Sequence, residues 1–292
     1  MPDVVLATCA DLPDGDEDGA ALVSALADVG IAADWRVWSD PAQRWDESLV
    51  VIRSTWDYTL DRASFLEWAR SLPQLANPAH VLEWNSDKTY LRDLAAAGIP
   101  IVPTDFAAPG ERVSLPHDVE FVVKPSVGAG SKGAGRFAAG AHVPAAVHVA
   151  ALHDAGRVVL VQPYVSGVDV SGEAALVYVG GRFSHAVTKG AMLPHGAVND
   201  LDPGFSRSLF VEERIAARAP GADELAVGGQ VLDFVRERFG LVPLYARVDL
   251  LPGDGGPVLV ELELTEPSLF LGYADGAALR FAAAIADRAG AA

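Results

Sequence analysis

The chain has 292 residues and is 50% hydrophobic, so it can bury a substantial core divided among two or three subdomains. Its 39 acidic and 22 basic residues give a formal charge of −17, which argues against nucleic acid or an anionic membrane as the main partner, because both attract clustered Lys and Arg. No apolar run reaches the roughly 18 residues that span a membrane, and the single cysteine, Cys9, excludes a disulfide framework, so we expect a cytoplasmic protein.

The first part of the chain alternates short apolar strands with helices. The expected elements are strands at 4–7, 31–37 and 49–52 and helices at 20–29 and 65–72. This alternation predicts a small parallel α/β layer over roughly residues 1–85. Ligands bind beyond the carboxyl ends of the strands in such layers, and the segments 8–11 and 53–58 lie there.

The pattern changes after residue 85, where longer helices and antiparallel-type strands follow one another. The expected elements are helices at 87–98, 144–155 and 222–239, strands at 121–125, 158–162, 174–179 and 182–188, a long loop through Gly204, an acidic hairpin and a closing Ala-rich helix. We expect a central subdomain at 86–165 and a C-terminal subdomain at 166–292.

The acidic hairpin is the most informative segment. Two apolar strands that carry acids, 246–249 and 258–264, flank a turn at 252–257. Glu261 and Glu263 are two residues apart, so on a strand they point to the same side. Carboxylates buried together need a cation, and oxygen ligands of this kind suit Mg²⁺. The alternative is an amphipathic edge strand with a wet acidic face.

The glycine-rich segment 128–133 formally matches the dinucleotide motif G-x-G-x-x-G. That motif requires a helix directly after the glycines, whereas residues 134–138 are typical of a returning strand. We therefore predict a hairpin flap whose backbone N–H groups face polyphosphate oxygens, with Lys124 and Lys88 as phosphate-binding charges. A mobile surface hairpin and solvated lysines remain the alternative. The strand at 160–165 could offer its backbone to an adenine edge, but taken alone it is an ordinary buried strand.

In their order and spacing, these segments resemble the ATP-grasp superfamily, in its branch of glutathione synthetases and ribosomal-modification ligases. The segments that carry the resemblance are Asn85-Ser86-Asp87-Lys88, Gly98-Ile99-Pro100, Lys124 with the glycine flap, Gln162-Pro163-Tyr164-Val165, Gly172-Glu173, Arg247-Val248-Asp249 and Glu261-Leu262-Glu263. The resemblance implies an ATP-grasp fold of class α/β (α+β), with three subdomains and an N-terminal Rossmann-like layer.

The resemblance also implies ATP and Mg²⁺ as cofactors and a role for each matching residue. The implied ATP-binding residues are Lys88, Lys124, Gly128, Gly130, Ser131, Gly133, Gln162, Tyr164, Val165, Asp169 and Glu173. The implied Mg²⁺ ligands are Asp249, Glu261 and Glu263, the last at a position where family members commonly have Asn. Arg247 would stabilise the transferred phosphoryl group, and Lys189 would lie near the nucleotide or that group.

Members of this family join a carboxylate to an amine through an acyl phosphate. The run 53–58 and the segment Val187-Thr188-Lys189-Gly190 are similar to a small bacterial subgroup, whose best-known member cyclises O-ureido-D-serine to D-cycloserine. That similarity implies a small amino acid as substrate, and the implied substrate contacts are Arg53, Ser54, Trp56, Asp57 and Tyr58. The run could instead be a helix-entry loop in which Asp57 is a local cap.

Two other functions stay open at this point. One is an intermolecular ligase that joins an amino acid to a separate amine, and the other is a nucleotide-binding protein without turnover. A homodimer is also compatible with the sequence.

Overall fold

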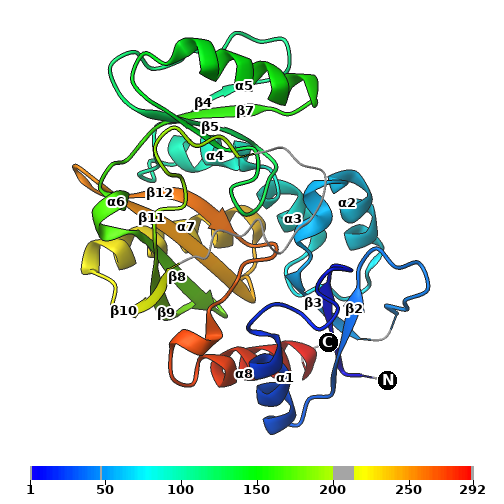
Figure 1. Cartoon of the computed structure of the whole chain (residues 1–292). Helices are drawn as coiled ribbons and strands as arrows, with labels where there is room; N and C mark the ends of the chain where they lie inside the picture. The colour runs from blue at the N-terminus through cyan, green and yellow to red at the C-terminus, as the bar shows by residue number, and fades with distance from the viewer. Residues whose placement is uncertain (1, 47, 200–213, 291–292) are drawn as a thin grey trace.

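A computed structural model describes residues 2–46, 48–199 and 214–290 (Figure 1). The described residues form three β-sheets, one within each of the segments 1–85, 86–165 and 166–292. The loop expected through Gly204 extends into residues 200–213 and so lies partly outside the described residues. The described helices all lack the length and apolar character needed to cross a membrane.

The N-terminal sheet is parallel, with the strand order β2-β1-β3, as the alternating pattern predicts. Its elements and the helices around it are β1 (Val4–Thr8), α1 (Gly19–Asp28), β2 (Ala33–Val37), β3 (Leu49–Ser54), η1 (Trp56–Thr59), α2 (Arg62–Ser71) and α3 (Ala79–Asn85). All residues of β1 and β3 are buried. The carboxyl ends of these two strands meet, because the hydroxyl groups of Thr8 and Ser54 are hydrogen-bonded at 2.7 Å.

The central sheet is antiparallel, with the order β4-β7-β5-β6, and α5 covers its outer face (Figure 1). Its elements are β4 (Asp105–Ala107), β5 (Phe121–Pro125), β6 (Gly135–Phe137), α5 (His142–Asp154) and β7 (Val159–Pro163). The glycine-rich segment joins β5 to β6, which are paired antiparallel. It is therefore a hairpin flap and not the start of a helix, as expected from the residues that follow it.

The C-terminal sheet has the order β10-β9-β8-β11-β12 and carries the acidic hairpin as β11 and β12. Its elements are α6 (Val168–Ser171), β8 (Glu173–Val179), β9 (Arg182–Lys189), β10 (Ile215–Arg218), α7 (Ala222–Phe239), β11 (Tyr245–Gly253) and β12 (Gly256–Glu263). The short elements β10 and α6 have too few residues to show a periodic pattern in the sequence, and neither was expected.

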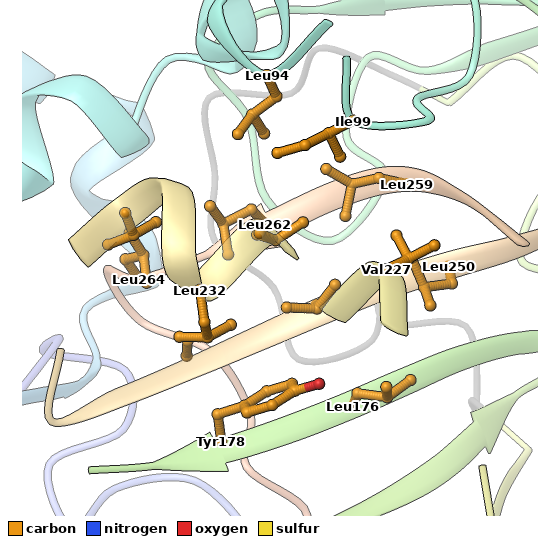
Figure 2. Close-up of a cluster of buried hydrophobic side chains, with 14 of the residues drawn as sticks. Leu94, Ile99, Leu176, Tyr178, Val227, Leu232, Leu250, Leu259, Leu262 and Leu264 are labelled. Carbon is orange, nitrogen blue, oxygen red and sulfur yellow. The ribbon is translucent and has the colours of Figure 1, made fainter. Parts of the chain in front are cut away.

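One face of this sheet packs against α7 and against the segment with η2 (Lys88–Tyr90) and α4 (Leu91–Ala96). Figure 2 shows Leu94 and Ile99 above Leu259 of β12, with Val227 and Leu232 of α7 in the same cluster. Residues 88–99 thus share a core with the C-terminal sheet, although they precede the central sheet in the chain.

The last helix, α8 (Ala277–Gly290), follows η4 (Leu271–Tyr273) and joins the C-terminal sheet to the N-terminal layer. Phe281 and Ile285 lie in one buried cluster with Leu22 and Leu26 of α1 and with Val177 of β8. The N-terminal and C-terminal parts therefore pack into one continuous unit, and the central sheet lies at one end of it (Figure 1). A cavity lies between the central and C-terminal sheets, next to the segments that follow β1 and β3.

Candidate active site

The cavity has a volume of about 870 Å³ and is lined by residues of the central and C-terminal sheets and by the segments that follow β1 and β3 of the N-terminal layer. It brings together most of the residues predicted from the sequence. The predicted residues that line it are Trp56, Tyr58, Lys88, Lys124, Gly128, Gly130, Ser131, Gln162, Tyr164, Val165, Glu173, Lys189, Arg247, Glu261 and Glu263. Residues separated by up to about 200 positions in the chain therefore face one space, which is the arrangement expected of an active site.

Three predicted substrate contacts are not part of the cavity lining. Arg53 and Ser54 are fully buried, and the Asp57 carboxylate accepts a hydrogen bond from the Trp38 indole at 2.6 Å. Arg53 lies 3.6 Å from the carboxylate of Asp16 and donates to the Pro267 carbonyl at 3.1 Å. Direct contact of Arg53, Ser54 and Asp57 with a substrate stays a prediction, and in this structure these residues lie behind the cavity wall.

Three other predicted residues, Gly133, Asp169 and Asp249, also lie outside the lining. The Gly133 carbonyl accepts a hydrogen bond from the His148 ring at 2.9 Å. Arg136 holds the Asp169 carboxylate at 3.2 and 3.1 Å. The Asp249 side chain is buried, at 1% exposed, and so does not reach the cavity surface.

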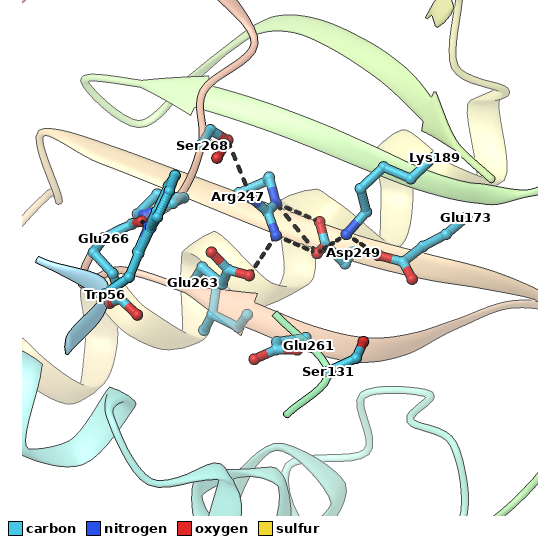
Figure 3. A network of polar contacts seen from close by, with 12 residues as sticks. Trp56, Ser131, Glu173, Lys189, Arg247, Asp249, Glu261, Glu263, Glu266 and Ser268 are labelled. Carbon is cyan, nitrogen blue, oxygen red and sulfur yellow. Dashed lines mark hydrogen bonds and ion pairs between the residues drawn. The ribbon is translucent and has the colours of Figure 1, made fainter. Parts of the chain in front are cut away.

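A chain of alternating charges runs along the acidic hairpin (Figure 3). The strand register places Asp249 opposite Glu261 and Arg247 opposite Glu263. Arg247 donates to both oxygens of Asp249, at 2.9 and 2.8 Å, and is paired with Glu263. Lys189 donates to Asp249 at 2.8 Å and is paired with Glu173. β12 is an edge strand, as the alternative interpretation supposed, but its acids face a basic cavity wall and not open solvent.

These contacts decide which carboxyl groups are charged. Burial alone would raise the pKa of Asp249, but the charges of Arg247 and Lys189 outweigh it and hold that pKa well below its usual range. Burial raises the pKa of Glu263 despite its contact with Arg247, and the nearby charge of Glu261 adds to the effect. Asp249 is therefore a fixed negative charge at neutral pH.

Two further cations lie under the flap. Lys88 is 2.9 Å from a Glu261 oxygen and donates to the Gly128 carbonyl at 2.7 Å. Burial would lower the pKa of Lys88, but the charge of Glu261 outweighs it and raises this pKa. Burial, with a contribution from the charge of Lys88, lowers the pKa of Lys124. Together with Lys189 and Arg247, these lysines place four basic side chains around one region of the cavity.

The predicted magnesium ligands are adjacent, but each is paired with a basic side chain. Among the described residues, no three His, Cys, Asp or Glu side chains are arranged to hold a metal ion. The ion pairs of Glu261 and Glu263 use only one oxygen of each carboxylate, and both residues line the cavity. Their second oxygens fit a divalent cation bound through one or two carboxylates and substrate phosphates. Asp249 is engaged at both oxygens, so it could join only by giving up a contact with Arg247 or Lys189.

Comparison with known proteins decides the family. Residues 4–80 match the family model of the N-terminal domain of D-cycloserine synthetase DcsG. The chain is 39% identical over 290 residues to the cycloserine biosynthesis protein DcsG of Streptomyces lavendulae, covering 94% of each protein. The chain belongs to the DcsG family. The crystal structure of D-cycloserine synthetase DcsG superposes with a TM-score of 0.85 at 36% identity, covering 98% of this chain and 99% of that one.

The fold predicted from the resemblance is also confirmed. The ATP-grasp ligase PsnB, solved with a phosphomimetic variant of a minimal precursor, Mg and ADP, superposes with a TM-score of 0.60 at 15% identity, over 99% of this chain and 100% of that one. At that identity the match shows the fold alone. This DcsG family member is thus an ATP-grasp enzyme, a ligase with a mixed α and β architecture.

In this member of the DcsG family, the cavity contains an acid that the sequence analysis missed. Glu266 lines the cavity, is 9% exposed, and its backbone carbonyl accepts a hydrogen bond from the Trp56 indole at 3.0 Å. Burial raises the pKa of Glu266 to about 8, and the charge of Glu263 adds to this effect. Glu261 and Glu263 were identified because alternate residues of a strand share a face, and the next residue in that series is Thr265. Glu266 falls between the positions of this series, so the pattern does not include it. Only its position three residues after an acidic strand pointed to it.

The raised pKa of Glu266 predicts a pH effect on stability. Its pKa is about 8 in the folded protein against a reference value of 4.5, so the folded state binds more protons between these values and stability falls as pH rises through this window. Glu266→Gln removes this loss, so the variant should gain stability over the parent between pH 5 and pH 8.5, by up to roughly 4 kcal/mol.

Urea unfolding of both proteins at these two pH values, without nucleotide, measures the difference. Glu83→Gln is the matched control, because Glu83 is about half exposed and paired with Arg70 at 2.8 Å, and it should show no such pH-dependent gain. A stability difference between Glu266→Gln and the parent that is the same at both pH values would contradict the prediction.

Proposed function

We propose that this protein uses ATP and Mg²⁺ to activate the carboxylate of a small amino acid as an acyl phosphate, and that a nitrogen of the same molecule then displaces the phosphate. The observation that carries the proposal is the convergence of Lys88, Lys124, Lys189 and Arg247 in the cavity under a glycine flap. Phosphoryl transfer depends mainly on positioning and on neutralising charge, which is what such a set of cations supplies.

The nucleotide would occupy the part of the cavity between the central and C-terminal sheets. Apolar side chains line this part from both sides, with Val122 of β5 on one sheet and Leu251 and Val260 of β11 and β12 on the other. A flat purine ring fits between two such walls, beside Gln162 and Tyr164 at the end of β7. The phosphates would then extend toward Lys88 and Lys124, beneath the glycine hairpin.

The magnesium ion would be held by the second carboxylate oxygens of Glu261 and Glu263. When bound, Mg²⁺ would neutralise charge on the transferred phosphate. Arg247 offers a planar guanidinium that can face the phosphoryl oxygens, because it is held in place by Asp249 and by the Ser268 carbonyl at 3.1 Å. The flap would exclude water, which otherwise hydrolyses an acyl phosphate.

The substrate that we propose is O-ureido-D-serine and the product D-cycloserine, by analogy with the DcsG relatives. The substrate carboxylate attacks the γ-phosphorus of ATP and ADP leaves. The nitrogen bound to the side-chain oxygen attacks the acyl carbon, phosphate leaves, and a five-membered ring closes. The carbamoyl group on that nitrogen must also be lost, and one water molecule converts it to CO₂ and ammonia.

ADP release with Mg²⁺-ATP and a panel of single amino acids, including both enantiomers of O-ureidoserine, tests this proposal. We expect turnover with O-ureido-D-serine, without any added amine, and formation of D-cycloserine detected by mass spectrometry. The Glu261→Gln variant, purified in the same way, controls for contaminating ATPases. Turnover that needs a separate amine would replace the proposal with an intermolecular ligase, and ATP binding without ADP release under any condition would indicate a protein without turnover.

A further inference from the structure

The Glu266 carboxylate is held at a defined place in the cavity wall. Two donors, one in β3 and one in η1, fix its backbone. The Trp56 indole donates to the Glu266 carbonyl at 3.0 Å, and Arg53 donates to the next carbonyl, that of Pro267, at 3.1 Å. Trp56 and Tyr58 line the cavity beside it. Figure 3 shows Glu266 next to Trp56. The carboxylate itself is hydrogen-bonded to the Tyr58 side chain, which keeps it in the cavity wall.

Glu266 differs from the other acids of this wall in its charge balance. Glu173, Glu261 and Glu263 are each paired with a basic side chain, namely Lys189, Lys88 and Arg247. Within the described part of the chain, Glu266 has no ion pair with a Lys, Arg or His.

A buried carboxylate of this kind is costly unless a cation reaches it. Burial and the charges of Glu263 and Glu261 raise the pKa of Glu266, whereas the charge of Lys88 and a hydrogen bond with the Tyr58 side chain oppose this rise without cancelling it. The site is therefore complementary to a positive group that comes from outside the protein.

We propose that Glu266 binds the α-ammonium group of the amino acid substrate and so directs the substrate carboxylate toward Arg247. This assignment rests on the proposed function. Arg247 donates to the carbonyl of Ser268, only two residues from Glu266, so the two sites lie close together. Carboxylate and ammonium of an α-amino acid are separated by one carbon atom, which matches adjacent sites. The Trp56 ring beside the carboxylate adds a face that attracts cations.

Asp16 and Asp18 are further acids with buried side chains that line the cavity. The Asp18 carboxylate accepts hydrogen bonds from the backbone N–H groups of Leu269 and Leu271 at 3.1 and 2.6 Å, so both of its oxygens are engaged. The Asp16 carboxylate already faces the guanidinium of Arg53 at 3.6 Å, and both side chains are almost fully buried. An ammonium group at Asp16 would therefore lie beside a buried positive charge. The charge balance favours Glu266.

The experiment compares two substrates in two proteins. The substrates are O-ureido-D-serine and 3-(ureidooxy)propanoate, which lacks only the α-amino group, and the proteins are the parent and Glu266→Gln. In the parent, kcat/KM should be at least about 30-fold higher for the amino substrate, because leaving a buried charge unpaired is costly. In Glu266→Gln this preference should fall to within about fivefold, through loss of activity on the amino substrate alone.

Several readouts keep the outcomes distinct. ATP affinity should be unchanged in Glu266→Gln, and Glu266→Asp should restore part of the preference. A variant that loses activity on both substrates by the same factor, keeping the parent's preference, would overturn the assignment. Failure of the parent to use O-ureido-D-serine would instead reject the proposed substrate, and the comparison would then use the amino acid that the panel identifies and its desamino form. Release of ADP with no amino acid at all would overturn both proposals.

Discussion

Arg247→Lys should reduce kcat by roughly 10²- to 10³-fold, with a smaller effect on ATP affinity. The Arg247 guanidinium contacts both oxygens of Asp249, the Glu263 carboxylate and the Ser268 carbonyl. A lysine ammonium is a single point charge on a flexible stem and cannot keep these contacts while facing a phosphoryl group. The loss should therefore appear in the chemical step.

Single-turnover measurement of ADP formation, with ATP affinity determined separately, separates the two effects. Arg218→Lys is the matched control, because Arg218 donates to both oxygens of Glu224 at 2.9 and 2.8 Å and does not line this cavity. It also removes an arginine contact with both oxygens of a carboxylate, and we expect kcat within about twofold of the parent. Unimpaired catalysis by Arg247→Lys would remove Arg247 from the mechanism.

The parts of the site that could be predicted from the sequence depend on local periodicity. A strand places alternate side chains on one face, so the pairs Glu261 with Glu263 and Arg247 with Asp249 are expected to share a face before their partners are known. The flap could be predicted in the same way, because the residues after its glycines do not open a helix. These patterns were sufficient to identify the family, and comparison with known proteins confirmed that identification.

The parts that could not be predicted depend on contacts between distant segments. Arg53 follows an apolar strand, and nothing near it in the sequence shows that Asp16 and Pro267 enclose it. Likewise, the neutralisation of Asp249 by Lys189, 60 residues away, follows from the pairing of β8 with both β9 and β11. Glu266 owes its properties to burial beside other acids, and burial of a single polar residue leaves no periodic signal.

Glu261→Gln should have the second large effect and should reduce turnover by at least about 100-fold, with a higher Mg²⁺ concentration needed for half-maximal activity. The neutral amide is a weaker ligand for Mg²⁺ than a carboxylate. The same change also removes the main counter-charge of two lysines, since Lys88 lies 2.9 Å from Glu261 and the charge of Glu261 raises the pKa of Lys124 against the effect of burial.

Titration of turnover with Mg²⁺ at fixed ATP tests this expectation, together with ATP binding measured in the presence of a chelator. Binding without Mg²⁺ should persist in Glu261→Gln, because removing a negative charge beside Lys88 does not weaken its attraction for phosphate. Glu83→Gln, at a surface ion pair, should show the parent's Mg²⁺ dependence. Near-normal turnover of Glu261→Gln at the parent's Mg²⁺ concentration would mean that the metal lies elsewhere. If Glu261→Gln lost both turnover and ATP binding in the presence of the chelator, Glu261 would act by positioning Lys88 and not as a metal ligand.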